Sequence, residues 1–309
     1  MALIFYSDSD RFEPWRDALT AAIPDLEIRH WDAPGDPAEI DFALVWLPPQ
    51  GALRRFPKLK AILNLGAGVD ALLKDPDLPP GVPIVRMVDD DLAKCMGEYV
   101  LLHVLRYHRE QPALDAQQRS KTWHNIASPA AAYRRVGVMG LGAMGSEAVR
   151  HLRAVGFDVA SWTRSAKAMP DVESFHGAGG LARFLARTEI LVCLLPLTPE
   201  TRGILNKDLF RRLPRGACLI NAGRGGHQVE ADILAALDDG QLAGATLDVF
   251  ATEPLPPESP FWMHPKVTVT PHNASVTNPR SAVRHVVESI RRVRAGEPLR
   301  HVVDPKVGY

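Results

Sequence analysis

Short apolar runs alternate with stretches of helical periodicity along most of the chain. The runs at 2–6, 43–46, 61–65 and 82–85 predict strands, as do later runs at 133–139, 157–162, 190–195, 217–221, 244–248 and 266–270. Helical spacing predicts helices at 97–110, 146–152, 228–239 and 276–295. Strands that alternate with helices in this way predict an α/β protein built on parallel sheets.

The strongest local signal is a glycine-rich turn between a strand and a helix. Residues 140–145 read Gly-Leu-Gly-Ala-Met-Gly, between the strand at 133–139 and a helix that ends near Gly156. The first glycine allows a tight turn, the second lets the backbone approach a pyrophosphate, and the third lets the helix pack on the strand. The N–H groups at the helix start then face the anion. With the second strand at 157–162 completing a β-α-β unit, the sequence predicts a dinucleotide site.

The end of that second strand indicates which dinucleotide is bound. In NAD-binding units an acidic residue about 20 positions beyond the motif binds the ribose 2′-hydroxyl, but here residues 163–167 read Thr-Arg-Ser-Ala-Lys, and Asp158 lies too early. Arg164 and Lys167 suit a 2′-phosphate, because a guanidinium makes planar bidentate contacts with phosphate. We predict a preference for NADP(H) over NAD(H). The alternative is that both cations are solvated surface residues.

Composition narrows the class of protein. A chain of 309 residues exceeds one typical domain, and its formal net charge of zero offers no basic field for nucleic acid or an anionic membrane. Cys95, Cys193 and Cys218 lack C-x-x-C spacing, and the last two lie in apolar runs typical of buried, reduced thiols. No export signal or membrane-length apolar run is evident. We expect a soluble, cytoplasmic protein without a metal site.

The sequence predicts two domains. Residues 98–279 form the expected NADP-binding domain, and residues 1–97 with 280–309 form the expected substrate domain. The first part lacks a phosphate loop but carries Gly66-Ala67-Gly68 directly after a strand. The final helical stretch follows the last strand, where a return of the chain to the first domain is expected.

Three polar residues follow later strands, where ligands bind in open α/β sheets. They are Arg224, Glu253 and His272. Individually they could be a surface Arg in an ion pair, a loop Glu, and a His whose hydrogen bonds are purely structural. Together they form a usable set, because a carboxylate beside a histidine favours the imidazolium, which can donate a proton to an oxygen gaining charge. The Arg adds a planar fork for a substrate carboxylate or carbonyl.

With these residues in place, the chain resembles the D-isomer-specific 2-hydroxyacid dehydrogenases almost end to end. The markers, in family order, are the glycine loop, Leu-Leu-Pro-Leu-Thr-Pro-Glu-Thr at 194–201, Asn-Ala-Gly-Arg-Gly at 221–225, Leu-Asp-Val-Phe at 247–250, Glu-Pro-Leu at 253–255 and Pro-His at 271–272. The runs at 46–49, 65–70, 162–165 and 253–260, and the terminal Gly-Tyr at 308–309, are similar to the bacterial glyoxylate/hydroxypyruvate reductase A branch.

The resemblance implies a fold, a reaction and a set of site residues. The fold is α/β, with two doubly wound parallel-sheet domains: a Rossmann-type cofactor domain and a flavodoxin-like substrate domain. The reaction is NADPH-dependent reduction of small 2-keto acids, glyoxylate to glycolate or hydroxypyruvate to D-glycerate, in a homodimer joined through the cofactor domains. Arg224 would orient the keto acid, His272 would be the acid/base and Glu253 its partner. The implied cofactor-binding residues are Gly140, Leu141, Gly142, Ala143, Met144, Gly145, Thr163, Arg164, Ser165, Lys167, Leu195, Pro196, Thr201, Ala222 and Asp248.

In the substrate domain, the resemblance implies that the main-chain N–H groups of Gly66, Ala67 and Gly68 bind the substrate carboxylate. Trp46 either walls the pocket or is a core aromatic at a strand end. The chain departs from the family pattern at 225–227, Gly-Gly-His, and at 272–275, His-Asn-Ala-Ser, where bulkier or more apolar residues are expected. These departures bear on substrate preference rather than on reaction class.

Two other functions remain open on the sequence. One is an NAD-linked dehydrogenase for a larger D-2-hydroxy acid, against which the missing ribose carboxylate argues. The other is a cofactor-sensing binding protein on the same scaffold, as in transcriptional corepressors that resemble this family. All three catalytic positions, and the lack of long interaction tails, argue against that function.

Overall fold

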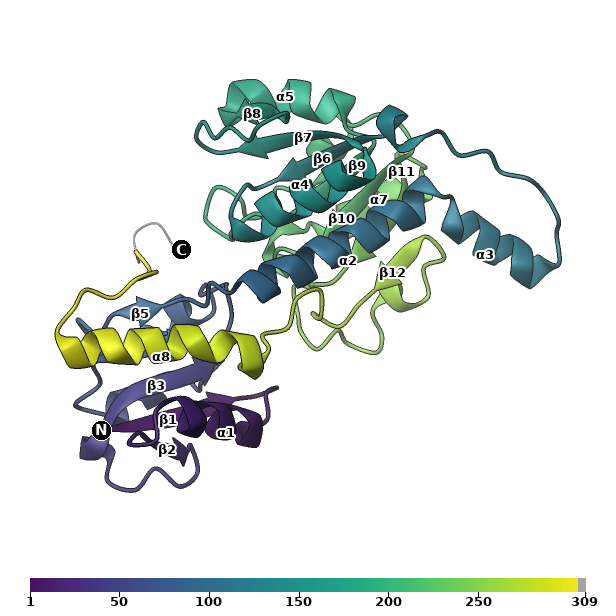
Figure 1. Ribbon diagram of the computed structural model, residues 1–309. Coiled ribbons are helices and arrows are strands. Elements are labelled where there is room, and N and C mark those ends of the chain that lie inside the picture. The colour runs from purple at the N-terminus through teal and green to yellow at the C-terminus, as the bar shows by residue number, and fades with distance from the viewer. Residues whose placement is uncertain (305–309) are drawn as a thin grey trace. The chain divides into compact units, whose positions relative to one another are not determined.

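The structure, a computed structural model, describes residues 1–304 (Figure 1). The Gly-Tyr at 308–309 lies outside the described residues. The chain divides into two compact units, Met1–Leu92 with the chain from Val276 on, and Ala93–Ser275. The sequence had placed these divisions after residue 97 and before residue 280. Each unit has its own parallel sheet.

The first unit is built on a five-stranded sheet in the order β2-β1-β3-β4-β5. Its strands are β1 (Ala2–Ser7), β2 (Glu27–His30), β3 (Ile40–Trp46), β4 (Ala61–Asn64) and β5 (Ile84–Val85). Its helices are α1 (Phe12–Ala22), α8 (Pro279–Ala295) and the 3₁₀ turns η1 (Pro37–Glu39), η2 (Ala52–Arg55) and η3 (Leu72–Lys74). All pairings between these strands are parallel, and the order is that of flavodoxin-like doubly wound sheets, as predicted.

The second unit is built on a seven-stranded parallel sheet in the order β12-β11-β10-β9-β6-β7-β8. Its strands are β6 (Arg135–Met139), β7 (Asp158–Thr163), β8 (Glu173–His176), β9 (Ile190–Cys193), β10 (Ala217–Asn221), β11 (Leu242–Leu247) and β12 (Val267–Val269). Its helices are α2 (Asp90–His108), which begins just before the boundary, α3 (Gln111–Ser120), α4 (Ala143–Val155), α5 (Gly177–Arg187), α6 (Lys207–Phe210), α7 (Glu230–Asp238), η4 (Ala131–Tyr133), η5 (Gly225–His227) and η6 (Pro260–Trp262).

This order is that of the Rossmann fold with one strand added at an edge, so the predicted fold class is confirmed for both units. The strand order reverses between β9 and β6. Such a switch point is where open α/β sheets bind their ligands.

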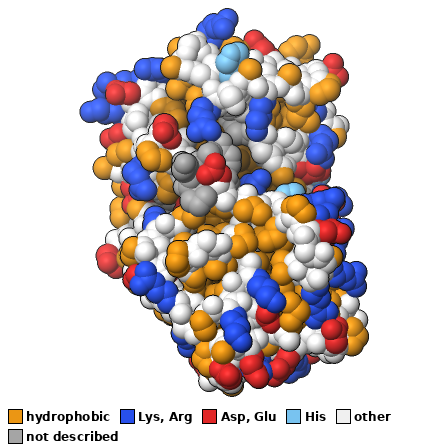
Figure 2. Space-filling view, turned by 90° about the vertical axis from the view of Figure 1, so that its left-hand side faces the viewer, with side chains coloured by type: hydrophobic (Ala, Val, Ile, Leu, Met, Phe, Trp, Pro, Cys, Tyr) orange, Lys and Arg blue, Asp and Glu red, His pale blue; other side chains and the backbone are white. Residues whose placement is uncertain are grey.

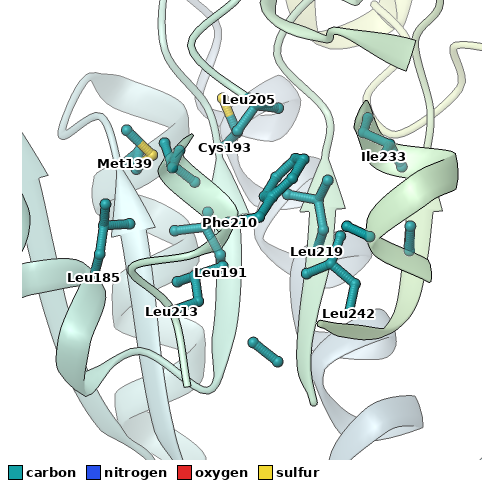
Figure 3. Close-up of a cluster of buried hydrophobic side chains, with 14 of the residues drawn as sticks. Met139, Leu185, Leu191, Cys193, Leu205, Phe210, Leu213, Leu219, Ile233 and Leu242 are labelled. Carbon is teal, nitrogen blue, oxygen red and sulfur yellow. The ribbon is translucent and has the colours of Figure 1, made fainter. Parts of the chain in front are cut away.

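Alternation along the central strands gives the second unit two apolar cores. Val136, Val138 and Val192 pack with α2 and α4 on one face. Met139, Leu191 and Cys193 point to the other face and pack with α5, α6 and α7 (Figure 3). Because both faces are covered, these strands are apolar at nearly every position, and hydrophobic burial fixes the sheet that positions the site.

An arm leaves the second unit after α2. It consists of α3 and the irregular chain that follows it, and it stands away from the sheet in Figure 1. No residue of α3 is buried. The Trp123 side chain is 101% exposed, and Tyr133, in η4 where the arm ends, is 78% exposed. This segment therefore offers large aromatic side chains to solvent.

The surface carries mixed charge. On the face drawn in Figure 2, Lys and Arg side chains are interspersed with Asp and Glu. In residues 1–304, none of the helices combines the length and apolar character needed to cross a membrane.

Candidate active site

The predicted site residues of the second unit follow the carboxyl ends of its strands. Since all seven strands are parallel, the loops after β6, β7, β9, β10, β11 and β12 lie along one edge of the sheet. The loops after β6 and β9 flank the switch point, and they touch, because a Cβ added at Gly140 would come within 2.7 Å of the Leu194 carbonyl oxygen.

The glycine loop has the geometry of a phosphate cradle. Gly140 has a φ of 102°, which favours glycine. Any Cβ at Gly145 would collide with the Gly140 carbonyl oxygen, whereas a Cβ at Gly142 would meet no atom within 4 Å. Helix α4 starts directly after Gly142, so its first N–H groups have no side-chain cap from that residue. Open space beside a helix N-terminus fits a dinucleotide pyrophosphate.

The cations predicted to select the cofactor are exposed at the end of β7. Arg164, Ser165 and Lys167 are all exposed, and Thr163 fixes the turn through its hydroxyl, which donates to the Ser165 carbonyl oxygen at 2.8 Å. Lys167 Nζ lies 3.5 Å from the Leu141 carbonyl oxygen, next to the glycine loop. Lys167 therefore borders the cradle, and Arg164 directly follows β7, the strand end where an adenosine 2′-phosphate would lie.

The loop after β9 adds the next predicted cofactor contacts. The Thr201 hydroxyl donates to the Pro196 carbonyl oxygen at 2.7 Å and closes the turn that starts at Leu195. Nearby, a hydrogen bond from the Thr198 hydroxyl, with a weaker contribution from Arg164, holds the pKa of the Glu200 carboxyl below its ordinary value. Ala222, at the end of β10, is buried.

A histidine and a carboxylate pair at the same edge. His272 Nδ1 lies 2.7 Å from Glu253 Oε2, and the two side chains are 37% and 35% exposed. The Phe250 N–H donates to Glu253 Oε1 at 2.9 Å. Burial alone would raise the pKa of the Glu253 carboxyl, but the hydrogen bonds from His272 and Phe250, with the charges of His272 and Arg224, hold it below its ordinary value. An ionised carboxylate only accepts, so Nδ1 carries a proton and Nε2 is the position that can exchange one.

The backbone at His272 has a strained conformation, and hydrogen bonds to Asp248 hold it in place. His272 has a φ of 52°, an uncommon conformation for a side-chain-bearing residue. Its N–H donates to the Asp248 carbonyl oxygen at 2.9 Å. The Asp248 carboxylate accepts from the Thr270 hydroxyl at 2.6 Å and from the N–H groups of Asn273 and Ala274 at 3.0 and 3.1 Å. Asp248, predicted only as a cofactor contact, is therefore also the anchor of the His272 loop.

Arg224 lies in a tightly packed loop after β10. Its Nη1 donates to the Gly223 carbonyl oxygen at 2.8 Å, and its charge is one of those acting on Glu253. A Cβ at Gly225 would collide with the Phe250 carbonyl oxygen, so this loop packs directly on the loop that leads to Glu253. The structure thus brings Arg224, Glu253 and His272 together within the second unit.

The predicted substrate residues of the first unit are Trp46, the last residue of β3, and Gly66, Ala67 and Gly68, which follow β4. The Asn64 side-chain amide, which is buried, donates to the Gly66 and Gly68 carbonyl oxygens at 2.8 and 2.9 Å. The Trp46 ring packs so closely on Gly66 that a Cβ there would collide with it. Trp46 is half-buried, so it is neither a full core residue nor a free surface one.

Sequence reasoning did not single out Asn64 or assign a role to His227. Both are polar residues inside otherwise buried segments, and His227 is 0% exposed. The sequence does carry a signal for each. Asn64 is a polar residue in an apolar run, and His227 lies where the chain departs from the family pattern.

The chain is similar to proteins of one known family. The model of the D-isomer specific 2-hydroxyacid dehydrogenase NAD-binding domain matches residues 101–274. Glyoxylate/hydroxypyruvate reductase A of Serratia proteamaculans is 44% identical, with 100% of each chain covered.

Two solved structures are similar over their whole length. A D-isomer specific 2-hydroxyacid dehydrogenase from Xanthobacter autotrophicus Py2, in complex with NADPH and MES, is 49% identical with a TM-score of 0.96, covering 100% of this chain and 99% of that one. An NADPH-dependent glyoxylate/hydroxypyruvate reductase from Sinorhizobium meliloti, in complex with NADP and sulfate, is 44% identical with a TM-score of 0.94 and the same coverage. This chain therefore belongs to the D-isomer specific 2-hydroxyacid dehydrogenase family.

Proposed function

We propose that the protein is an NADPH-dependent reductase of small 2-keto acids, which converts glyoxylate to glycolate and hydroxypyruvate to D-glycerate. The observation that carries this proposal is the His272–Glu253 pair, 2.7 Å apart and close to Arg224, at the sheet edge that also holds the glycine loop. Bacterial relatives over 40% identical along the full chain are named for this reaction, which supports the choice of substrates.

The roles of the catalytic residues follow from their chemistry. When bound, NADPH supplies the hydride for the keto carbon. Arg224 orients the keto acid through its planar guanidinium. His272 gives a proton from Nε2 to the former carbonyl oxygen as negative charge develops there, and Glu253 holds the ring by Nδ1 and stabilises the imidazolium. For oxidation of the hydroxy acid, the same nitrogen accepts the proton.

In the first unit, we assign the carboxylate of the keto acid to the main-chain N–H groups of Gly66, Ala67 and Gly68. Asn64 supports this role, because it binds two of the three carbonyl oxygens of this turn and so fixes its backbone. Trp46 would limit the size of the substrate, since its ring is held against Gly66.

The Arg164→Asp variant tests the cofactor assignment. We expect it to use NADPH less well and NADH relatively better, because the substitution replaces a phosphate partner with a repelling charge. The measurement is kcat/KM for each cofactor with glyoxylate. Arg215→Asp is the matched control, because Arg215 precedes β10, at the opposite edge of the sheet. An unchanged ratio of the two cofactors in Arg164→Asp would refute the 2′-phosphate site.

We further propose that two copies of this chain form a homodimer through the second unit, with the arm at 111–130 in the interface. The fully exposed Trp123 side chain supports this, since a buried Trp commonly dominates an interface. Trp123→Ser should weaken dimerisation by about 2 kcal/mol or more. Trp262→Ser, which alters another exposed Trp of the second unit, should not. Sedimentation across a dilution series measures both, and equal dimer stability in the two variants would contradict the assignment.

One experiment separates the candidate functions. Purified protein is mixed with NADPH or NADH and a panel of 2-keto acids, and absorbance at 340 nm is followed. We expect the highest kcat/KM with NADPH and glyoxylate or hydroxypyruvate. Preference for NADH and a larger keto acid would indicate a different D-2-hydroxyacid dehydrogenase. Tight NADPH binding without any turnover would indicate a cofactor-sensing protein.

A further inference from the structure

His227 is a fully buried histidine between two loops of the candidate site. It closes the short helix η5 after Arg224, and its side chain is 0% exposed. The ring packs against the loop it follows, because a Cβ at Gly223 would lie 3.0 Å from His227 Nδ1 and 3.2 Å from the Leu195 carbonyl oxygen. The ring therefore lies where the loops after β9 and β10 meet.

Both ring nitrogens of His227 bind main-chain groups. Nδ1 accepts a hydrogen bond from the Arg224 N–H at 3.1 Å. Nε2 lies 3.2 Å from the Pro196 carbonyl oxygen. Because a carbonyl can only accept, Nε2 carries the ring proton, and the acceptor Nδ1 does not. The two bonds therefore select one neutral tautomer, which leaves His227 without a nitrogen for proton transfer.

The backbone around the ring reinforces this arrangement. The Leu205 N–H donates to the His227 carbonyl oxygen at 2.8 Å, and the Gly203 N–H donates to the Gly226 carbonyl oxygen at 2.9 Å. Through these bonds the segment after β9 runs alongside η5. The two loops are thus joined by main-chain hydrogen bonds as well as through the His227 ring.

We propose that His227 is a positioning residue that clamps the substrate-orienting Arg224 to the cofactor-binding turn at Pro196. The inference rests on the proposed function, which assigns Arg224 to the keto acid, and on the cofactor-binding role that the family resemblance implies for Pro196. The Nδ1 bond fixes the backbone of Arg224, and with it the point from which the Arg224 side chain extends. The Nε2 bond fixes the Pro196 turn.

Two conservative variants separate the two bonds. In His227→Asn, Oδ1 can occupy the place of Nδ1 and keep the Arg224 bond, while the Pro196 bond is lost. In His227→Gln, Nε2 can occupy the place of the ring Nε2 and keep the Pro196 bond, while the Arg224 bond is lost. Loss of one buried hydrogen bond commonly changes a binding or rate constant by roughly tenfold.

The readouts are the Kd of NADPH, measured by calorimetry without substrate, and kcat/KM for glyoxylate at saturating NADPH. We expect His227→Asn to raise the Kd of NADPH about tenfold with little change in substrate use at saturation. We expect His227→Gln to lower kcat/KM for glyoxylate about tenfold with little change in the Kd. His108→Gln is the control, a buried histidine that packs on Phe157 before β7, at the opposite edge; it should change neither constant.

The outcomes distinguish the inference from the function on which it rests. If the wild-type protein binds NADPH but reduces no keto acid, the proposed function fails. If it is active and both His227 variants change both constants by the same factor, or neither constant, the clamp is refuted. If the variants do not fold, NMR spectra of the wild-type protein labelled with ¹⁵N-histidine still test the clamp. A slowly exchanging neutral ring with its proton on Nε2, shifted by added NADPH, supports the clamp, and the absence of such a ring overturns it.

Discussion

The His272→Ala variant should reduce glyoxylate about 10²–10⁴-fold more slowly in kcat, the usual range for a positioned general acid. The reason is geometric. His272 Nδ1 is held 2.7 Å from Glu253, so Nε2 is the nitrogen that can give a proton to the substrate oxygen. NADPH binding should change little, because the glycine loop does not depend on this ring. The measurement is kcat for reduction together with the Kd of NADPH.

The matched control is His264→Ala. His264 also pairs with a carboxylate, since its Nε2 lies 3.4 Å from Asp238, but it precedes β12 and so lies at the opposite edge of the sheet. Its loss should leave kcat near the wild-type value. If His272→Ala kept close to the wild-type rate, or if His264→Ala lost as much activity, the acid/base assignment would be wrong.

The same pair predicts a pH dependence with a definite sign. The pKa of Glu253 is held below its ordinary value, so its carboxylate is charged throughout the neutral range. Reduction should therefore hold across the neutral range and fall in acid, where protonation of the Glu253 carboxylate removes the charged partner of His272 Nδ1. Glu253→Gln has no carboxylate to protonate, so its reduction should be slower at neutral pH and should lack this fall in acid. Coincident kcat/KM profiles for wild type and variant would contradict the pairing.

The central strands could be predicted from the sequence because they are buried on both faces. Strands β6, β9 and β10 are apolar at most positions and stand out as runs. The edge strands β2 and β8 were missed, since Glu27–His30 and Glu173–His176 carry polar residues at half or more of their positions. Helix α3 was missed as well, because it has no buried face to give it an apolar stripe.

The candidate site could be predicted where the residue type alone indicates the role, as for a glycine in a tight turn or a histidine in acid/base catalysis. Close backbone contacts demand glycine at 140 and 145, and Gly142 leaves open space at the start of α4. The parallel strands then bring Arg224, Glu253 and His272 to one edge of the sheet. Supporting residues were not predictable in this way. The contacts of His227 and Asn64 depend on which carbonyl and N–H groups face them, and local sequence does not encode that.

Arg224→Lys should lower kcat/KM for glyoxylate by about 1.5–3 kcal/mol in transition-state stabilisation, which is roughly 10- to 150-fold, while the Kd of NADPH changes much less. A lysine keeps the positive charge but loses the planar fork that can hold two oxygens of a keto acid at once. Arg187→Lys is the matched control, because the largely buried Arg187 side chain pairs with Asp158 and Glu173, away from the loops that carry Arg224, Glu253 and His272, and should affect stability rather than turnover. Near-normal kcat/KM in a folded Arg224→Lys protein would show that charge alone suffices, and the substrate-orienting role of the guanidinium would have to be abandoned.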